Sequence, residues 1–285
     1  MFDVIKGDLE ILEQGLQEAV TSPNELVTEV GMHLVTSGGK RIRPALCLLS
    51  ARGGKAFDLP HVLPLAEALE LIHTASLVHD DVIDEADTRR GAATANARWN
   101  NQVAILSGDY IFARAFALLA EAGYGDYVSK RLAELVCNLS VGEIIQDHAV
   151  YQASRGMADY YERIQKKTAD FLEICCELGG LVGGMDKEAA EKLAEYGHCI
   201  GMAFQIQDDV LDVIGNEALL GKPVHSDEKN EKTTWVTVYG LEQAKKDVAE
   251  YSEEAMAILA QMTGVTEPEK SFLYDFVEYL IHRNK

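Results

Sequence analysis

The pattern Asp-Asp-x-x-Asp occurs twice in this chain of 285 residues, at 80–84 (DDVID) and at 208–212 (DDVLD). On a helix the first and fifth positions of the pattern lie on one face about one turn apart, so each copy offers two or three carboxylates to one point. Such a cluster repels itself unless a cation is bound, and Mg²⁺ binds carboxylate oxygens while leaving positions open for water and phosphate. The two copies predict a metal clamp for a polyphosphate.

The residues that precede each copy strengthen this interpretation. Strongly apolar helical stretches come before both motifs, at 63–78 and 200–206. An unpaired carboxylate cluster would be costly to bury beside them, and metal ligation removes that cost. For a single copy, a solvated acidic helix end would explain the residues equally well. The second copy favours the metal site.

Basic residues are outnumbered in this chain, but they occur in clusters. The 26 lysines and arginines face 46 aspartates and glutamates, which gives a net charge of −20 and argues against a nucleic-acid partner. The basic segments lie at 40–43 (KRIR), 89–90 (RR), 166–167 (KK) and 222–232. Helix N-termini and guanidinium groups both bind phosphate oxygens. Each cluster alone could be a surface turn, but together they predict sites for anionic groups.

Two uncharged side chains complete the candidate site. Thr168 follows the lysine pair at 166–167, and Gln205 precedes Asp208 by one helical turn on the same face. An amide dipole at that depth can stabilise a developing cation without reacting with it. We therefore expect Gln205 to face the same space as the second acidic motif.

The elements that must position these residues are helices. Apolar residues recur at spacings of three and four over most of the chain, and the prolines lie where helices would begin. The sequence predicts an all-α, single-domain bundle of about ten helices over residues 1–285, wrapped around long central members and an elongated cavity. Residues 233–239 (TTWVTVY) have a strand-like composition, but a lone strand would have no partner, so we expect tertiary context to override it.

Composition also bears on the cellular setting. The N-terminus lacks the basic and apolar regions of a signal peptide, and we expect no apolar stretch of membrane-spanning length. The five cysteines have no CxxC spacing and are expected to be reduced core residues. The protein is expected to be cytoplasmic.

A rival interpretation comes from two ExxH patterns, at 70–73 and 195–198. Two such motifs on helices, with two further glutamates, can form a di-iron site, and Glu143 is a candidate extra ligand. This alternative leaves both acidic motifs and the basic clusters without a role.

The ordered motifs resemble those of the trans-isoprenyl diphosphate synthases, the family of farnesyl, geranylgeranyl and longer polyprenyl diphosphate synthases. The resemblance covers nearly the whole chain. It rests on GGKRIRP at 38–44, HTASLVHDDVIDEADTRRG at 73–91, SGDYIFARAF at 107–116, KKTADF at 166–171, FQIQDDVLD at 204–212, GKPVHSD at 221–227 and the terminal YLIHRNK. It implies the isoprenoid synthase fold and a homodimer. It also implies a head-to-tail prenyltransferase that uses isopentenyl diphosphate and an allylic prenyl diphosphate.

The resemblance also implies roles for individual residues. About three Mg²⁺ ions would be held mainly by Asp80, Asp84 and Asp208, with Asp81, Asp209 and Asp212 completing or supporting their shells. The leaving diphosphate would be stabilised by Arg89, Lys167, Lys222 and Lys232. Carbon charge would be stabilised by Thr168 and Gln205. Isopentenyl diphosphate would be held by Lys40, Arg43, His73 and Arg90.

Product length is predicted from the residues about one turn before Asp80. A helical turn rises about 5.4 Å, roughly one isoprene unit, so Ala75 and Ser76 are expected to meter the product. Farnesyl-type members carry bulky aromatics there or an insertion in the first motif, and this chain has neither. We therefore expect a product longer than C15, with Leu71, Ile72, Ile111, Phe112 and Phe116 as the candidate floor.

Departures from the family pattern keep other functions open. Residues 231–236 (EKTTWV) stand where Gly-Lys-x-Thr-Leu-Pro is frequent, and the chain is as short as shorter-chain enzymes. A farnesyl-type short-chain synthase, a terpene cyclase and a non-catalytic subunit of a heteromeric synthase are the alternatives. A cyclase would normally lack the second acidic motif, and non-catalytic subunits lose aspartates that this chain retains.

Overall fold

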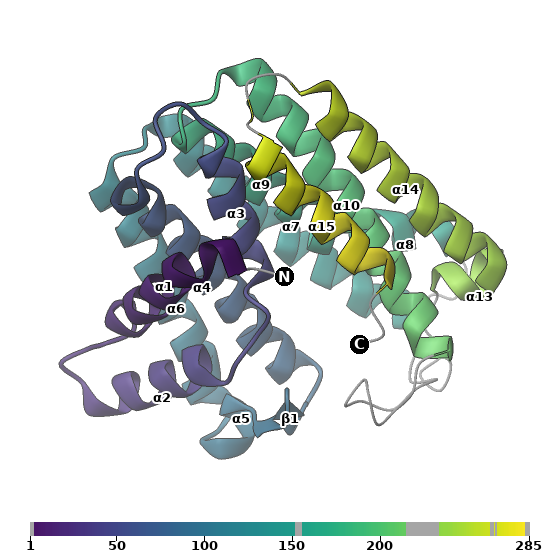
Figure 1. Ribbon diagram of the computed structural model, residues 1–285. Helices are drawn as coiled ribbons and strands as arrows, with labels where there is room; N and C mark the ends of the chain where they lie inside the picture. The colour runs from purple at the N-terminus through teal and green to yellow at the C-terminus, as the bar shows by residue number, and fades with distance from the viewer. Residues whose placement is uncertain (1–2, 152–155, 215–233, 263–264, 266, 283–285) are drawn as a thin grey trace.

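The computed structural model describes residues 3–151, 156–214, 234–262, 265 and 267–282, and these are helical almost throughout (Figure 1). In chain order the helices are η1 (Asp3–Ile5), α1 (Lys6–Ala19), α2 (Glu25–Thr36), α3 (Ile42–Arg52), α4 (Leu59–Ile83), α5 (Ala95–Arg98), α6 (Asn101–Ala122), α7 (Asp126–Tyr151), α8 (Gly156–Ile164), the π-helical turn η2 (Gln165–Ala169), α9 (Asp170–Val182), α10 (Lys187–Ile214), α13 (Trp235–Tyr239), α14 (Leu241–Gln261) and α15 (Glu267–His282). The strands β1 (Thr88–Arg89) and β2 (Ala92–Ala93) form an antiparallel hairpin. The predicted all-α bundle is confirmed.

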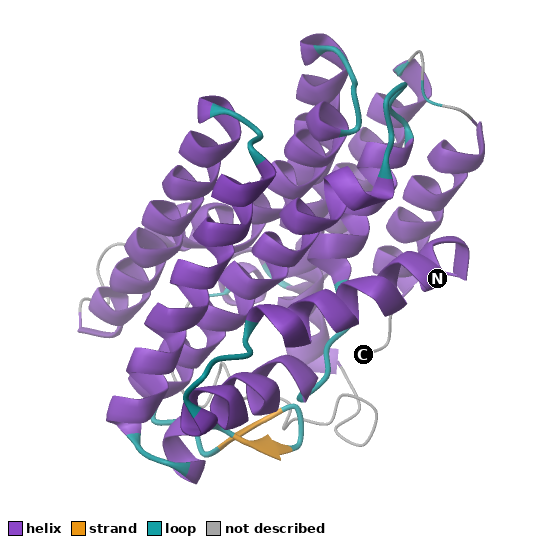
Figure 2. Ribbon diagram, turned by 90° about the vertical axis from the view of Figure 1, so that its left-hand side faces the viewer, coloured by secondary structure: helices purple, strands orange, loops and turns teal. Residues whose placement is uncertain are grey.

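The two acidic motifs end the two long helices α4 and α10. Helix α4 packs along α6, and α10 packs against α9 and α14. Most helices run side by side, with the hairpin at one end of the bundle (Figure 2). The core between them is apolar, and Phe171, Tyr196 and Phe276 are its largest fully buried side chains. The motifs therefore lie on helices that packing holds along much of their length.

Glycines permit a close approach between α3 and α9. A Cβ on Gly179 would lie 2.4 Å from the carbonyl oxygen of Cys47, and one on Gly183 would lie 2.2 Å from that of Ala51. A larger residue at either position would push the two helices apart. This approach brings Arg43, near the start of α3, over the ring of Phe171 at the start of α9.

The chain reverses direction directly after the first motif. Helix α4 ends at Ile83, and Asp84 is its C-cap residue. The Ala86 N–H donates to the Asp81 carbonyl oxygen at 2.9 Å, and the Thr94 hydroxyl donates to the Ala86 carbonyl oxygen at 2.7 Å. This turn carries Arg89 and Arg90 back beside the motif.

The segment with strand-like composition is helical where it is described. Thr234 caps α13, and its hydroxyl accepts from the Thr237 N–H at 3.2 Å while the Thr237 hydroxyl accepts from the Thr234 N–H at 2.9 Å. This reciprocal cap satisfies donors that the first turn of a helix leaves unpaired. Local capping and packing thus override the β propensity of these residues, as the sequence predicted.

Helix α6 differs from one sequence expectation. It is long and apolar enough to cross a membrane by length and composition, with a mean hydropathy of 1.6 over an 18-residue window. Only 28% of that window is buried within the chain. The expectation that no apolar stretch reaches spanning length is therefore wrong for α6. Its composition is apolar because one side packs on α4 and much of the other side also carries apolar residues.

Candidate active site

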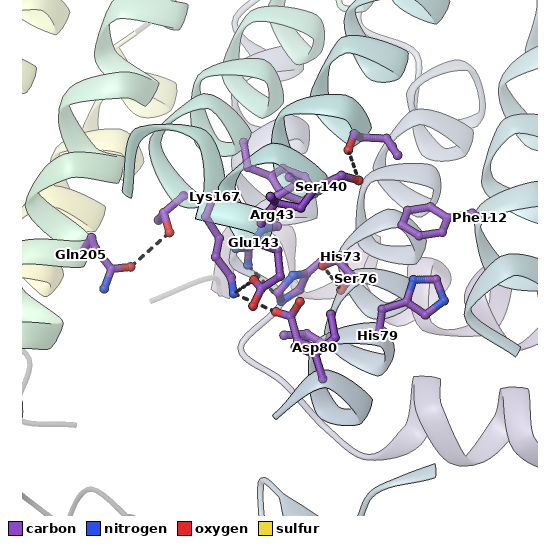
Figure 3. A pocket seen from close by; sticks show the side chains of 17 residues that line it. Arg43, His73, Ser76, His79, Asp80, Phe112, Ser140, Glu143, Lys167 and Gln205 are labelled. Carbon is purple, nitrogen blue, oxygen red and sulfur yellow. Dashed lines mark hydrogen bonds and ion pairs between the residues drawn. The ribbon is translucent and has the colours of Figure 1, made fainter. Parts of the chain in front are cut away.

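A cavity of about 580 Å³ opens at the end of the bundle that carries the first acidic motif (Figure 3). It collects side chains from α3, α4, α6, α7, η2, α9 and α10. Its lining residues are Arg43, His73, Ser76, Leu77, His79, Asp80, Ile83, Phe112, Val136, Leu139, Ser140, Glu143, Ile144, Lys167, Thr168, Phe171 and Gln205. Eight residues predicted from the sequence are therefore brought together: Arg43, His73, Ser76, Asp80, Phe112, Lys167, Thr168 and Gln205.

A three-membered ion cluster lies at the mouth of this cavity. The Lys167 ammonium contacts the Asp80 carboxylate at 3.0 Å and also donates to Glu143, as Figure 3 shows. Burial alone would lower the pKa of Lys167, but Asp80 and Glu143 outweigh burial and raise it. Burial raises the pKa of Glu143, and Lys167 opposes that shift. Lys167 is thus held as a cation beside the first aspartate of the motif.

Glu143 is the residue that sequence reasoning missed in this role. The sequence offers Glu143 only as a candidate ligand of a di-iron site. Its carboxylate reaches Lys167 from α7, which precedes η2 in the chain, so no local spacing links the two residues. The contact depends on how α7 packs against η2.

The second aspartate of the first motif is paired outside the cavity. Asp81 is 4% exposed and accepts from Arg89 Nε at 2.6 Å. Burial raises the pKa of Asp81, and Arg89 works in the opposite direction. Asp84, one turn after Asp80, is exposed. The three carboxylates of this motif therefore occupy three different environments.

The second motif is likewise divided. Asp209 accepts from the Tyr160 hydroxyl and from the Trp235 N–H, the latter at 2.8 Å. Asp209 and Asp212 are buried, and Asp208 is half-buried. One turn before Asp208, Gln205 lines the cavity, and its carbonyl oxygen accepts from the Thr168 hydroxyl at 3.1 Å. The predicted proximity of Thr168 and Gln205 is present in the structure.

Arg43 and His73 form a pair in the wall of the cavity. Arg43 Nη1 lies 3.1 Å from His73 Nε2, and its guanidinium stacks 4.7 Å from the centre of the Phe171 ring. Arg43 Nε is buried and has no hydrogen-bond acceptor among the described residues. Burial first, and then Arg43 and neighbouring arginines, hold the pKa of His73 well below 6.5. A neutral imidazole and an unsatisfied guanidinium donor suit an anionic ligand.

The remaining basic residues meet near the glycine pair. Arg90 Nη1 donates to the Gly38 carbonyl oxygen, and Gly39 lies so close that a Cβ there would be 2.6 Å from Arg90 Nη1. Lys40 is exposed and donates to the Tyr279 hydroxyl at 3.0 Å. Two clusters that are far apart in the sequence are thus adjacent. The predicted contacts Lys222 and Lys232 lie outside the described residues.

Arg41, the middle cation of the first basic cluster, does not line the cavity and forms ion pairs within the fold. It pairs with Glu13 at 2.5 Å and with Glu70 at 2.7 Å, and it is 8% exposed. Glu70 is the first residue of one ExxH pattern, and its carboxylate is occupied by this arginine. Glu195 of the other pattern pairs with Lys192 at 2.8 Å. Within the described residues, the two patterns do not form one di-iron site.

The donor chemistry fits Mg²⁺ at the first motif. Asp80 offers a carboxylate oxygen into the cavity, Asp84 lies at the adjacent helix end, and hard oxygen donors are what Mg²⁺ requires. Arg43 lines the same cavity, and a guanidinium group suits a phosphate oxygen.

A separate group of ligand atoms lies away from the cavity. Asp170, Glu173 and His198 have ligand atoms within 4.8 Å of one another, but none of the three lines the cavity. Arg131 pairs with Glu173 at 3.0 Å, and Asn138 donates to Asp170 at 3.0 Å. Protein donors therefore already compensate this group.

The same group makes stability depend on pH. Interaction with Glu173, 3.6 Å from His198 Nδ1, raises the pKa of His198 despite burial. Protonated His198 therefore stabilises the folded state. This contribution is complete below the ordinary imidazole pKa of 6.5 and is lost as the pH rises through the raised pKa of His198 in the folded state. We expect the free energy of unfolding to fall over that window in urea titrations, and His198→Gln to remove the fall. His61→Gln is the control, and an unchanged slope in His198→Gln would contradict this assignment.

Comparison with known proteins places the chain in a family. A model of the polyprenyl synthetase family matches residues 24–269. Over 267 residues the chain is 41% identical to heptaprenyl diphosphate synthase component 2 of Geobacillus stearothermophilus, covering 93% of this chain and 82% of that protein. Over 252 residues it is 36% identical to a short chain isoprenyl diphosphate synthase of Methanothermobacter thermautotrophicus, covering 86% and 77%. The crystal structure of heptaprenyl diphosphate synthase from Staphylococcus aureus superposes with a TM-score of 0.92 at 31% identity, covering 99% of both chains.

The fold and the cavity with its acidic and basic rim define a prenyl diphosphate synthase. The chain belongs to the polyprenyl synthetase family. The predicted class, a prenyltransferase enzyme with the isoprenoid synthase fold, is confirmed.

Proposed function

We propose that the protein condenses isopentenyl diphosphate with an allylic prenyl diphosphate to make an all-trans polyprenyl diphosphate longer than C15. The observation that carries this proposal is the meeting of Asp80, Lys167 and Arg43 in one cavity that apolar side chains also line. The two named relatives differ in chain length, since one is a heptaprenyl and the other a short chain synthase. The small residue Ser76 in the cavity wall favours the longer product.

The first step is loss of diphosphate from the allylic substrate. The metal ligands in this proposal are Asp80, Asp84 and Asp208, and Asp81, Asp209 and Asp212 support them from the neighbouring helix positions. About three bound Mg²⁺ ions would supply positive charge that stabilises the leaving diphosphate. Lys167, Arg89, Lys222 and Lys232 would add donors to the same group. The Thr168–Gln205 pair, which lines the cavity, would stabilise the positive carbon without attacking it.

The second step joins the two substrates. Arg43, His73, Arg90 and Lys40 would hold the diphosphate of isopentenyl diphosphate. Its double bond then attacks C1 of the allylic cation, a carbon–carbon bond forms, and loss of a proton restores a double bond. Because His73 is held neutral, it would serve as a hydrogen-bonding group rather than as a charge.

Product mass tests this proposal directly. The purified protein is incubated with Mg²⁺, isopentenyl diphosphate and either dimethylallyl, geranyl or farnesyl diphosphate, and the products are measured by mass spectrometry. We expect products longer than C15 from at least one starter. Products that stop at C15 would establish the short-chain alternative, and absence of elongation with every starter would refute a self-sufficient synthase.

Glu143→Gln tests how the ion cluster prepares the metal site. Without the Glu143 charge, the Lys167 ammonium pairs with Asp80 alone. A Mg²⁺ ion that binds Asp80 then has one negative charge fewer nearby and must displace a more strongly held ammonium group. A pair of unit charges about 4 Å apart interacts by about 1 kcal/mol even in bulk water, so we expect at least about fivefold more Mg²⁺ for half-maximal activity. Glu134→Gln, an exposed change on the same helix, is the control. An unchanged Mg²⁺ requirement in Glu143→Gln would refute this role.

The proposal includes a homodimer, with residues 1–285 acting as one domain in the cytoplasm. Exposed apolar side chains on α6 and α7 support a covered face there: Leu106 and Ile144 are each 59% exposed. Light scattering after size-exclusion chromatography gives the oligomeric state. A monomer at micromolar concentration would contradict this part of the proposal.

A second candidate is a subunit of a two-component synthase. The observation that favours it is the name of the relative from Geobacillus stearothermophilus, which is component 2 of a heptaprenyl diphosphate synthase. In that case the isolated chain would bind substrates without elongating them, and the incubation described above separates the two candidates.

A further inference from the structure

The second acidic motif contains one aspartate with partners from two other segments. Asp209 is 5% exposed, and its Oδ2 accepts from the Trp235 N–H at 2.8 Å and from the Tyr160 hydroxyl. The Trp235 N–H lies in the first turn of α13, where no helical carbonyl is available to it. Tyr160 belongs to α8 and is itself buried. One carboxylate therefore joins α8, α10 and α13.

Aromatic contacts extend this junction. The Trp235 ring lies 6.2 Å from the Tyr160 ring and 5.3 Å from the Tyr239 ring, measured between centres. Its indole N–H donates to Asp247 of α14 at 2.5 Å. The side chain that packs here and the backbone N–H that meets Asp209 belong to the same residue, so displacement of one moves the other.

The first motif shows the same division of labour. Asp81, its second aspartate, is held by Arg89 from the turn that follows α4, whereas Asp80 lines the cavity. Successive residues on a helix are about 100° apart, so the second aspartate of DDxxD cannot share the direction of the first. In each copy the second aspartate reaches a neighbouring segment of the chain.

We propose that Asp209 is a positioning residue: it fastens the start of α13 and Tyr160 to α10, and so sets the orientation of Asp208 on the same helix. This rests on the proposed function, in which Asp208 is a principal metal ligand. The substrate-facing role then belongs to Asp208, and the charge of Asp209 is dispensable as long as its hydrogen-bond acceptor is kept.

Conservative and non-conservative variants separate a positioning role from a metal ligand. Asp209→Asn keeps an oxygen for the Trp235 N–H but removes the charge, whereas Asp209→Ala removes both. We expect Asp209→Asn to retain kcat and the Mg²⁺ requirement within about threefold, because the amide oxygen still accepts from the Trp235 N–H with about half the strength of the charged acceptor. We expect Asp209→Ala to lower kcat about tenfold or more, and Asp208→Asn about 100-fold or more. Asp209→Asn as impaired as Asp208→Asn, or Asp209→Ala equal to the parent, would overturn the proposal.

Fluorescence supplies a readout that needs neither metal nor turnover. The chain has two tryptophans, Trp99 and Trp235, so Trp99→Phe leaves Trp235 as the one indole fluorophore. In this background, without Mg²⁺, we expect Asp209→Ala to shift the Trp235 emission to longer wavelength, and Asp209→Asn and Asp208→Ala to leave it unchanged. An unshifted Asp209→Ala spectrum would overturn the proposal. Circular dichroism melts establish that each variant is folded.

The two measurements also separate this proposal from the proposed function. If the parent protein elongates no substrate but the emission shift occurs only in Asp209→Ala, the positioning contact stands and the proposed function fails. If the parent elongates and Asp209→Ala shows neither an emission shift nor a loss of kcat, the positioning role fails by itself.

Discussion

Replacement of Asp80 by asparagine should lower kcat for chain elongation by about 10³-fold. Asp80 is the aspartate of the first motif that lines the cavity, and an amide oxygen carries no charge with which to hold Mg²⁺ against a diphosphate. Loss of one preorganised group that stabilises developing charge typically costs about 10²–10³-fold, and loss of a metal ligand removes more than one interaction. Steady-state kinetics with saturating isopentenyl and allylic diphosphates measure the effect.

A matched control is available nearby. Asp87→Asn makes the same chemical change at an exposed residue of the turn after α4. It should leave kcat unchanged. Thermal shift on adding Mg²⁺ with inorganic pyrophosphate provides a readout other than activity: the shift should persist in Asp87→Asn and be lost in Asp80→Asn. An Asp80→Asn protein that keeps more than a tenth of the parental kcat would exclude Asp80 as a principal ligand.

The second large effect is expected on product length, at Ser76. Its side chain lines the cavity and donates to the His73 carbonyl oxygen at 2.9 Å. A phenylalanine ring there would occupy space that the growing hydrocarbon needs, at a depth of about one helical turn below Asp80. Ser76→Phe should therefore move the main product to C15 or shorter, and mass spectrometry of the extracted products measures the change.

Ala75→Phe should behave differently, although the sequence treats the two positions alike. Ala75 is fully buried in the core and does not line the cavity. An added ring there overpacks the core, at a cost of about 1–3 kcal/mol. We expect a lower melting temperature and a smaller change in product. Ser129→Phe, an exposed change on α7, is the control for the added ring. Unaltered product length in both Ser76→Phe and Ala75→Phe would refute metering at this depth.

The candidate floor of the cavity also differs from its prediction. Of the residues expected there, Phe112 lines the cavity, and its ring centre is 5.7 Å from that of His79. Leu71, Ile72 and Ile111 are fully buried within the hydrophobic core instead. Phe116 packs against the same core and does not line the cavity. Most of the expected floor is therefore core, because the direction of a side chain depends on helix rotation, which residue number does not give.

The sequence by itself determined the features that depend on local spacing. Helices follow from apolar residues at intervals of three and four, the position of Gln205 one helical turn before Asp208 follows from residue number, and the family follows from several ordered motifs. Each of these is a property of residues that are neighbours along the chain. The tertiary structure was not needed to predict an all-α prenyltransferase with acidic and basic groups around one site.

Only the tertiary structure decided which of several equivalent-looking residues faces the site. Asp80 lines the cavity while Asp81 meets Arg89, Asp209 meets Trp235, and Ser76 rather than Ala75 borders the hydrocarbon space. Adjacent residues on a helix differ by about 100° in direction, so the rotation of each packed helix assigns their roles. That rotation is set by packing between segments distant in sequence, such as the approach of α3 to α9, and no local pattern in the chain records it.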